Sequence, residues 1–136
     1  MASLDEFCSI KATLDMNVIG ETPAGMRINF PFTGTAISSH WEGERPVGGV
    51  DYVTVRSDGH MRLDIHGVIG EGRQKVSYTA TGVSLAGEER GTAFPHELLT
   101  FETADQDLGF LNTSIAVGLG SVRAGQLELT VWLVHP

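Results

Sequence analysis

Residues 51–69 read DYVTVRSDGHMRLDIHGVI and carry the clearest structural signal in the chain. The pair Asp58-Gly59 lies between two segments in which apolar and polar residues alternate. Alternation with a period of two is typical of a half-buried strand, and an Asp-Gly pair tolerates the positive φ angles of a tight turn. This stretch therefore predicts a β-hairpin.

Short segments with strand-like composition, separated by glycines, continue on both sides of the hairpin. Seventeen glycines are spread over the 136 residues, and no stretch between them holds a helical period over three turns. The expected strands are Phe7–Leu14, Met26–Phe30, Gly34–Ser39, Asp51–Arg56, Met61–Ile69, Gln74–Val83, Leu98–Thr103, Asn112–Val117 and Gln126–Val134. Residues 86–97 are expected to form a long loop, a lid over a barrel mouth. The sequence predicts one all-β antiparallel domain over residues 1–136.

Composition limits the partners. Acidic residues outnumber Lys and Arg by 17 to 9, and the net charge of −8 without a basic cluster argues against nucleic acid. No apolar run approaches the ~20 residues that span a bilayer, and Met1–Lys11 lacks the features of a secretion signal. We therefore expect a cytoplasmic protein without a membrane partner. The single cysteine, Cys8, predicts a buried and unpaired thiol.

The register of the first hairpin decides which side chains share a face. If Asp58 and Gly59 are the two residues of the turn, Asp51 lies opposite His66 and on the same face as Asp64. Arg62, two residues before Asp64, belongs to this face as well.

A second turn, centred on Glu71-Gly72, extends this polar face to a third strand through Lys75, Ser77 and Thr79. Two interpretations of the face remain open. It is the solvated side of a sheet whose other side covers the core, or it turns inward and lines a pocket.

The inward interpretation places Asp51 beside His66, with Asp64 two residues along the strand. A carboxylate next to an imidazole orients the ring and raises its pKa, which suits general acid–base chemistry. No third residue has the spacing to complete a metal site with Asp64 and His66, and motifs for nucleotide binding or a serine nucleophile are missing. We expect neither a metal nor a cofactor.

Several short segments, in the same order along most of the chain, resemble a family of bacterial and fungal proteins, the domain of unknown function 3237. They are residues 20–25 (GETPAG), the strand at Gly34, residues 47–52 (VGGVDY), Asp58-Gly59 followed by Leu63-Asp64, Gly82, residues 101–103 (FET), Leu111-Asn112 and residues 117–120 (VGLG).

This resemblance implies a compact barrel, similar to those of allene oxide cyclase and dirigent proteins, with a pocket along its axis. Its polar positions fall on Asp51, Asp64, Glu102 and Asn112 of this sequence. Similar members often carry arginines where this chain has His66, Thr79 and Thr81, and an Arg-Thr-Thr-Pro-like stretch at residues 96–99. Fewer cations weaken the binding of strongly anionic substrates.

Some similar members look like decarboxylases or lyases that act on lignin-derived phenolic acids without a cofactor. The resemblance therefore favours an enzyme doing acid–base chemistry, as a decarboxylase, lyase, cyclase or isomerase, on a small, partly aromatic molecule. The alternative is a barrel that binds such a molecule without changing it. The expected catalytic residues are Asp51, Asp64, His66 and Glu102, and the expected substrate-binding residues are Arg62, Lys75, Ser77, Thr79, Asn112 and Trp132.

Apolar faces on the predicted strands also favour self-association, because an exposed apolar sheet surface needs a cover. We therefore expect a homo-oligomer.

Overall fold

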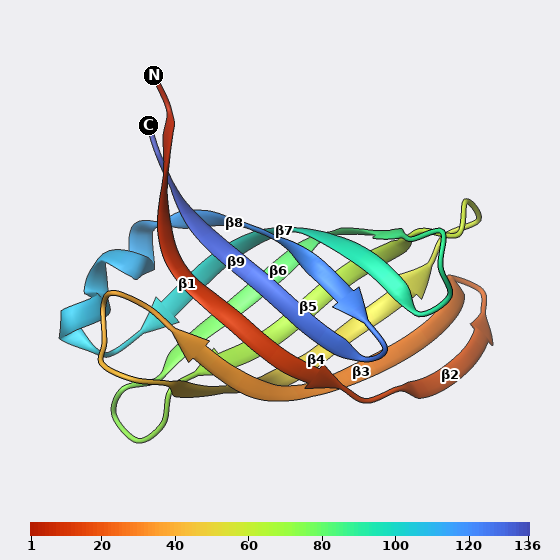
Figure 1. The fold of residues 1–136 in the computed structure, drawn as a ribbon, viewed down its shortest axis with the longest axis horizontal. Helices are drawn as coiled ribbons and strands as arrows, with labels where there is room; N and C mark the ends of the chain where they lie inside the picture. Colours follow the sequence, from red (N-terminus) through yellow and green to blue (C-terminus); the bar gives the residue numbers. More distant parts are fainter.

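The computed structural model describes residues 1–136 and contains nine antiparallel strands and one short 3-10 helix (Figure 1). The elements are β1 Ser3–Leu14, β2 Asn17–Thr22, β3 Gly25–Ile37, β4 Arg45–Val55, β5 Met61–Ile69, β6 Val76–Ala86, β7 Thr92–Thr103, η1 Gln106–Thr113, β8 Ile115–Arg123 and β9 Gln126–His135. None of its helices is long and apolar enough to cross a bilayer.

Eight of the strands close into a barrel. Each strand from β3 to β9 pairs with the next, and β1 closes the ring by pairing with β9 on one side and with β3 on the other. Strand β2 lies outside the ring and pairs only with the first half of β3. The prediction of an all-β antiparallel barrel is confirmed.

Two of the predicted strand boundaries are wrong at positions where a proline lies within a strand. Strand β3 joins the two expected strands of residues 26–39, because Pro31 lies where β3 changes partner from β2 to β1 and no ladder needs its missing N–H. The expected loop over residues 86–97 is only residues 87–91. Strand β7 starts at Thr92 and includes Pro95, where the ladder to β8 is interrupted.

The turn between β4 and β5 contains one residue more than predicted. Arg56 and His60 form a backbone hydrogen bond of 2.8 Å, so the loop is residues 57–59, with Gly59 at a φ of +87°. A three-residue loop with a left-handed glycine shifts the register by one position relative to a two-residue turn.

This shift changes which residues of β4 and β5 share a face. Asp51 lies opposite Ile65 instead of His66, and Thr54 lies opposite Arg62. Because side chains alternate along a strand, a one-residue shift reverses the faces of one strand relative to its partner. The expectation that Asp51, Asp64 and His66 share a face is therefore wrong.

The two ends of the barrel differ. The end near η1, called the η1 end below, is filled by fully buried side chains from several strands and from η1, among them Phe7, Ile69, Val76, Leu108 and Leu111. The opposite end carries the turns at residues 56–60, 87–91 and 124–125, and it is called the turn end. The cavity described below lies in the half of the barrel near the turn end.

Candidate functional site

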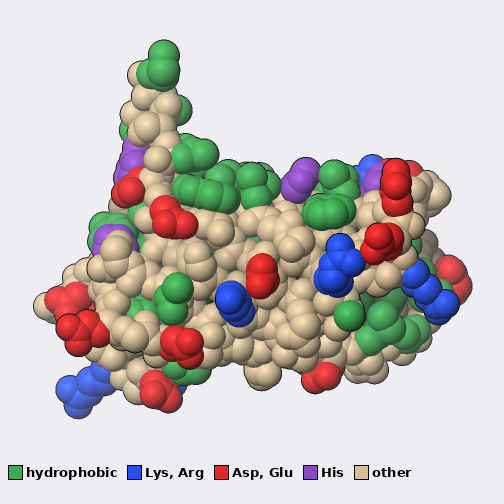
Figure 2. Space-filling view, viewed as in Figure 1, with side chains coloured by type: hydrophobic (Ala, Val, Ile, Leu, Met, Phe, Trp, Pro, Cys, Tyr) green, Lys and Arg blue, Asp and Glu red, His purple; other side chains and the backbone are tan.

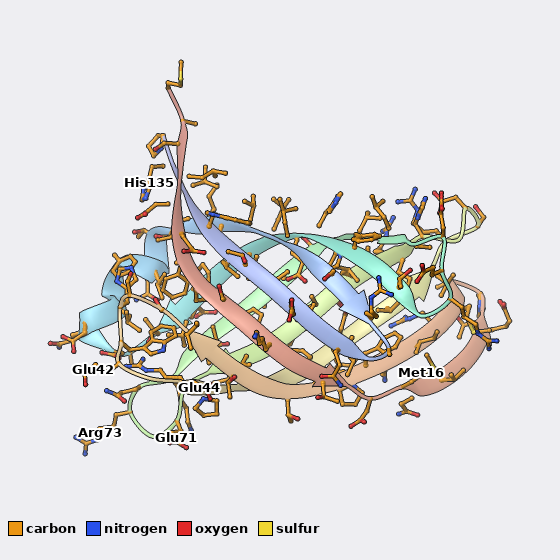
Figure 3. All side chains as sticks on the ribbon, viewed as in Figure 1. Met16, Glu42, Glu44, Glu71, Arg73 and His135 are labelled. Atoms are coloured by element: carbon orange, nitrogen blue, oxygen red, sulfur yellow. The ribbon has the colours of Figure 1, made fainter.

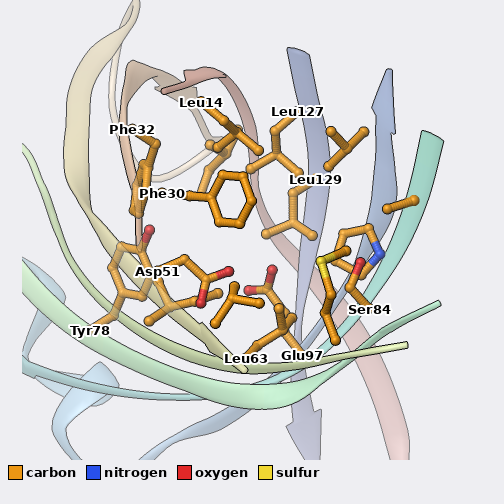
Figure 4. Close-up of a pocket in the computed structure, with 17 residues that line it drawn as sticks. Leu14, Phe30, Phe32, Asp51, Leu63, Tyr78, Ser84, Glu97, Leu127 and Leu129 are labelled. Atoms are coloured by element: carbon orange, nitrogen blue, oxygen red, sulfur yellow. The ribbon is translucent and has the colours of Figure 1, made fainter. Parts of the chain in front are cut away.

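A cavity of about 100 Å³ lies inside the barrel near the turn end (Figure 4). Most of its lining is aliphatic or aromatic, including Phe30, Phe32 and Leu129. Leu14, Met61, Ala93, Val122 and Leu127 line it where their strands meet the turn end. The polar side chains that line it are Asp51, Tyr78, Ser84 and Glu97. The site is therefore an apolar chamber with a small number of functional groups.

Asp51 enters the chamber from the middle of β4. Its Oδ1 accepts a hydrogen bond of 3.1 Å from the backbone N–H of Asp64, where the ladder between β4 and β5 is interrupted. Burial raises the pKa of Asp51 to about 6, against an opposing effect of this hydrogen bond and a smaller contribution from the charge on Asp64. Asp51 is therefore held in one orientation and is mainly ionised at pH 7.

Glu97 enters from the middle of β7 and is only 5% exposed. Its neighbours in the sheet are two glycines, Gly82 on β6 and Gly118 on β8. A Cβ added at Gly118 would lie 3.2 Å from Leu99 Cδ1 and 3.4 Å from both Glu97 Cβ and Leu129 Cδ2, so neighbouring side chains pack closely over this glycine.

Burial raises the pKa of Glu97 to about 8, and the charge on Asp51 adds to this effect. Glu97 is therefore mainly protonated at pH 7. Figure 4 shows the carboxyl groups of Asp51 and Glu97 directed into the same space. Two carboxyl groups whose environments separate their pKa values in this way supply a base and an acid at the same pH.

Tyr78 forms part of the wall beside these carboxyls. Its ring covers Gly67 on β5, where an added Cβ would lie 2.5 Å from Tyr78 Cζ. Burial raises the pKa of the Tyr78 phenol well above its ordinary value, so the group stays neutral.

No lysine or arginine lines the chamber. Charged side chains of the loops at the η1 end extend outward instead, as Figure 3 shows for Glu42, Glu44, Glu71 and Arg73. No group of three or more His, Cys, Asp or Glu side chains is placed to hold a metal ion. The groups available for chemistry are therefore the carboxyls and hydroxyls of the chamber.

Asp64 and His66 lie on the outer wall. His66 Nε2 is 3.2 Å from Asp64 Oδ1, and both side chains are more than half exposed, at 59% and 58%. The predicted pair of Asp51 with His66 does not form; His66 pairs with Asp64 instead, and this pair lies in solvent. The one-residue shift of the turn places them there.

The other predicted site residues also lie outside the chamber. Lys75, Ser77, Glu102 and Asn112 surround an open hollow on the outer surface near the η1 end. The side chain of Asn112 bonds to both the N–H and the C=O of Thr103, at 2.7 and 3.0 Å, and so attaches η1 to β7.

The remaining predicted substrate-binding residues are Arg62, Thr79 and Trp132. Arg62 and Thr79 are exposed on β5 and β6, and Trp132 lies on the outer face of β9, between the inward-facing Val131 and Leu133. The expectation that these side chains bind a substrate inside the barrel is wrong in its geometry. Of the predicted residues, only Asp51 reaches the chamber.

Glu97, Tyr78 and Ser84 line the chamber but are not among the site residues predicted from the sequence. Glu97 lies two and four residues before the buried Leu99 and Phe101 on β7, and this spacing is a signal that it faces inward. The prediction of a loop over residues 86–97 hides that signal.

Fold and chamber together define a small β-barrel with an apolar interior chamber that carries two unlike carboxyl groups. Residues 2–134 match the family described as Protein of unknown function (DUF3237), and the chain belongs to that family. No curated protein is similar to it in sequence.

Solved structures with the same fold have low sequence identity to this chain. A β-barrel-like protein of Acinetobacter baumannii AYE has a TM-score of 0.84 at 16% identity, with 99% of this chain and 97% of the other covered. A protein with unknown function from Clostridium acetobutylicum ATCC 824 has a TM-score of 0.85 at 20% identity, with 99% and 100% covered. An enzyme from Penicillium herquei has a TM-score of 0.65 at 18% identity, with 98% and 95% covered. These similarities establish the fold.

Proposed function

We propose that this protein is an enzyme that carries out acid–base chemistry, without a cofactor, on a small organic molecule bound inside the barrel. The observation that carries the proposal is that Asp51 and Glu97 line one apolar chamber. Burial raises the pKa of Asp51 to about 6 and that of Glu97 to about 8, which favours opposite roles for the two groups at neutral pH. Asp51 is the base that removes a proton, and Glu97 is the acid that donates one. Each such transfer typically contributes a factor of ~10²–10⁴ to the rate.

The lining limits the charge of the substrate. The chamber has no cation, so an anionic substrate would meet the carboxylate of Asp51 without compensation. This favours an isomerase, lyase or cyclase acting on an uncharged molecule over a decarboxylase acting on a phenolic acid. The aromatic side chains Phe30, Phe32 and Tyr78 suit a flat ring.

The volume limits the size of the substrate. An apolar cavity of ~150 Å³ holds benzene. The chamber of about 100 Å³ is somewhat smaller, so a single ring enters if side chains at the turn end move aside. Met61 is suited to this movement because its side chain is unbranched and flexible.

The Penicillium herquei protein of similar fold is described as an enzyme. That description supports catalysis as one use of this barrel, although the fold alone does not define a reaction. The reaction has to be argued from the chamber.

The proposal is tested with a library of small uncharged cyclic compounds. Binding is detected by thermal shift, and each compound that binds is then incubated with the protein and followed by NMR for conversion. We expect conversion by the wild type, a loss of ~100-fold or more in Asp51→Asn, and a smaller loss in Glu97→Gln, whose amide keeps an N–H donor. The matched control is Glu128→Gln, which removes an exposed carboxylate of β9. Binding without conversion of any compound would contradict the proposal and identify a non-catalytic binding barrel.

A further inference from the structure

The two carboxyl groups of the chamber differ in how they are held. Asp51 Oδ1 already accepts the backbone N–H of Asp64 at 3.1 Å, so Oδ2 is the oxygen left to act on a ligand. Glu97 lines the same chamber, and its carboxyl is directed into the same space as that of Asp51 (Figure 4). A fixed carboxylate therefore shares the chamber with an acid group that borders the space for a ligand.

A buried acid group normally has a hydrogen-bond partner, and the carboxyl of Glu97 lines the chamber, where a ligand can supply one. The sheet neighbours of Glu97 are two glycines, which place no side chain of their own beside it. Because Glu97 lines the chamber, its O–H is available to a ligand oxygen.

Breaking a C–H bond next to a carbonyl group requires these two functions together. A base takes the hydrogen, and a donor binds the carbonyl oxygen, which gains negative charge as the bond breaks. In an apolar site the donor is most effective as a neutral acid, since it stabilises the charged oxygen without bringing a charge of its own.

We infer that the substrate is a small uncharged ketone or aldehyde with a hydrogen on the carbon next to its carbonyl, and that Asp51 and Glu97 convert it through its enol. The inference rests on the proposed function and names its substrate class.

The step balances within the chamber. Asp51 Oδ2 takes the hydrogen as a proton, and the electron pair of the broken C–H bond forms a carbon–carbon double bond. The pair of the carbonyl double bond moves to the oxygen, which takes the proton of Glu97. Asp51 is then neutral and Glu97 is a carboxylate. Return of the proton from Asp51 to the same carbon, or to the far carbon of a conjugated system, restores a carbonyl compound as Glu97 recovers its own proton.

Exchange of hydrogen for deuterium tests this step without knowledge of the natural substrate. Cyclopentanone, cyclohexanone and 2-cyclohexenone are incubated with the protein in D₂O, and loss of the proton signal next to the carbonyl is followed by NMR. We expect saturable exchange with at least one of the three ketones. Asp51→Asn is expected to lower its rate ~100-fold or more. Exchange at the uncatalysed rate with all three overturns the inference.

Two variants at position 97 separate a donor from a space-filling side chain. Glu97→Leu keeps the volume but removes the donor, and we expect exchange to fall by a factor of ~10²–10³. Glu97→Gln keeps an N–H donor and is expected to restore part of that loss. Glu128→Gln is the matched control and should exchange ketones at the wild-type rate. Equal rates in wild type and Glu97→Leu would overturn the role of Glu97 as donor. Circular dichroism verifies that each variant is folded.

Ligand charge gives an independent readout. Phenol resembles an enol in shape and polarity, so we expect it to inhibit exchange competitively and to bind at least 10-fold more tightly than benzoate or benzylamine. Preferred binding of benzylamine would overturn the inference in favour of a site for organic cations. If no ketone exchanges but another library compound is converted in an Asp51-dependent way, the inference fails while the proposed function stands.

Discussion

Replacing Glu97 by Gln is expected to stabilise the barrel at alkaline pH and to change its stability little at acidic pH. Burial raises the pKa of Glu97 from its ordinary value of 4.5 to about 8. The folded protein therefore holds this proton more tightly than the unfolded chain does. Stability from this group is fully present below pH 4.5 and is lost as the pH rises through 8. Gln has no proton to lose, so the variant escapes this decline.

The magnitude follows from the size of the shift. One pKa unit corresponds to about 1.4 kcal/mol, so ionisation of Glu97 lowers the free energy of unfolding by about 4 kcal/mol between pH 5 and pH 8.5. Asp51, whose pKa rises from 3.8 to about 6, has the same sign. It adds about 1.4 kcal/mol to the loss, mostly between pH 5 and 6. For a domain of this length, 4 kcal/mol corresponds to roughly 12–20 °C in the melting temperature.

Urea unfolding at pH 5, 7 and 8.5 measures this difference, with the fluorescence of the two tryptophans as the signal. The advantage of Glu97→Gln over wild type should grow from near zero at pH 5 to about 4 kcal/mol at pH 8.5. Glu128→Gln, on the outer wall, should show no such growth. A difference between wild type and Glu97→Gln that is the same at all three pH values would refute the reasoning.

Three further predictions concern packing and surfaces. Gly67→Ala places a Cβ 2.5 Å from Tyr78 Cζ, so urea unfolding should show a loss of about 1–3 kcal/mol; an unchanged midpoint would show that the ring moves freely. Cys8 is 2% exposed and burial raises its pKa to about 12. A thiol reagent at pH 8 should therefore label it only as the protein unfolds, and rapid labelling of the native protein would contradict this. Leu98 and Ile115 are 64% and 57% exposed and belong to a row of exposed hydrophobic side chains on β7 and β8. Figure 2 shows hydrophobic side chains along the upper edge of the molecule. We expect this row to mediate self-association, so light scattering should give an oligomer for wild type and a monomer for Ile115→Lys; a monomeric wild type would disprove it.

Much of the fold was predictable because glycine spacing and alternation report on strands locally. Closure of the sheet was expected only from the family resemblance, since it depends on the pairing of β1 with β3, whose paired residues are more than 15 positions apart in the chain. Strand β2 was missed because it is short and contains a bulge between Val18 and Gly20, which breaks the alternation.

The site was harder to predict because it depended on a single loop. Asp58-Gly59 fits a two-residue turn and also a three-residue loop that ends in a left-handed glycine, and sequence alone does not distinguish them. The backbone bond between Arg56 and His60 selects the longer loop. The inward direction of Asp51 was nevertheless predictable. Asp51 lies two and four residues before the apolar Val53 and Val55, so the three side chains point to the same side of β4.

Strand β7 shows most directly how stability and function are connected. Its buried positions are occupied by apolar residues apart from Glu97, and burial of this carboxyl destabilises the folded state once the group ionises. Asp51 is likewise a carboxyl among apolar inward-facing residues, on β4, and it faces the same chamber, although it accepts a hydrogen bond from the N–H of Asp64. Two such groups would each be replaced by an apolar residue if packing were the only requirement, so their place in the chamber indicates that the chamber is used for chemistry. The stability measurement therefore also bears on the proposed function. If Glu97→Gln gives no pH-dependent gain, Glu97 is not protonated at neutral pH, and the assignment of Asp51 as base and Glu97 as acid loses its physical basis.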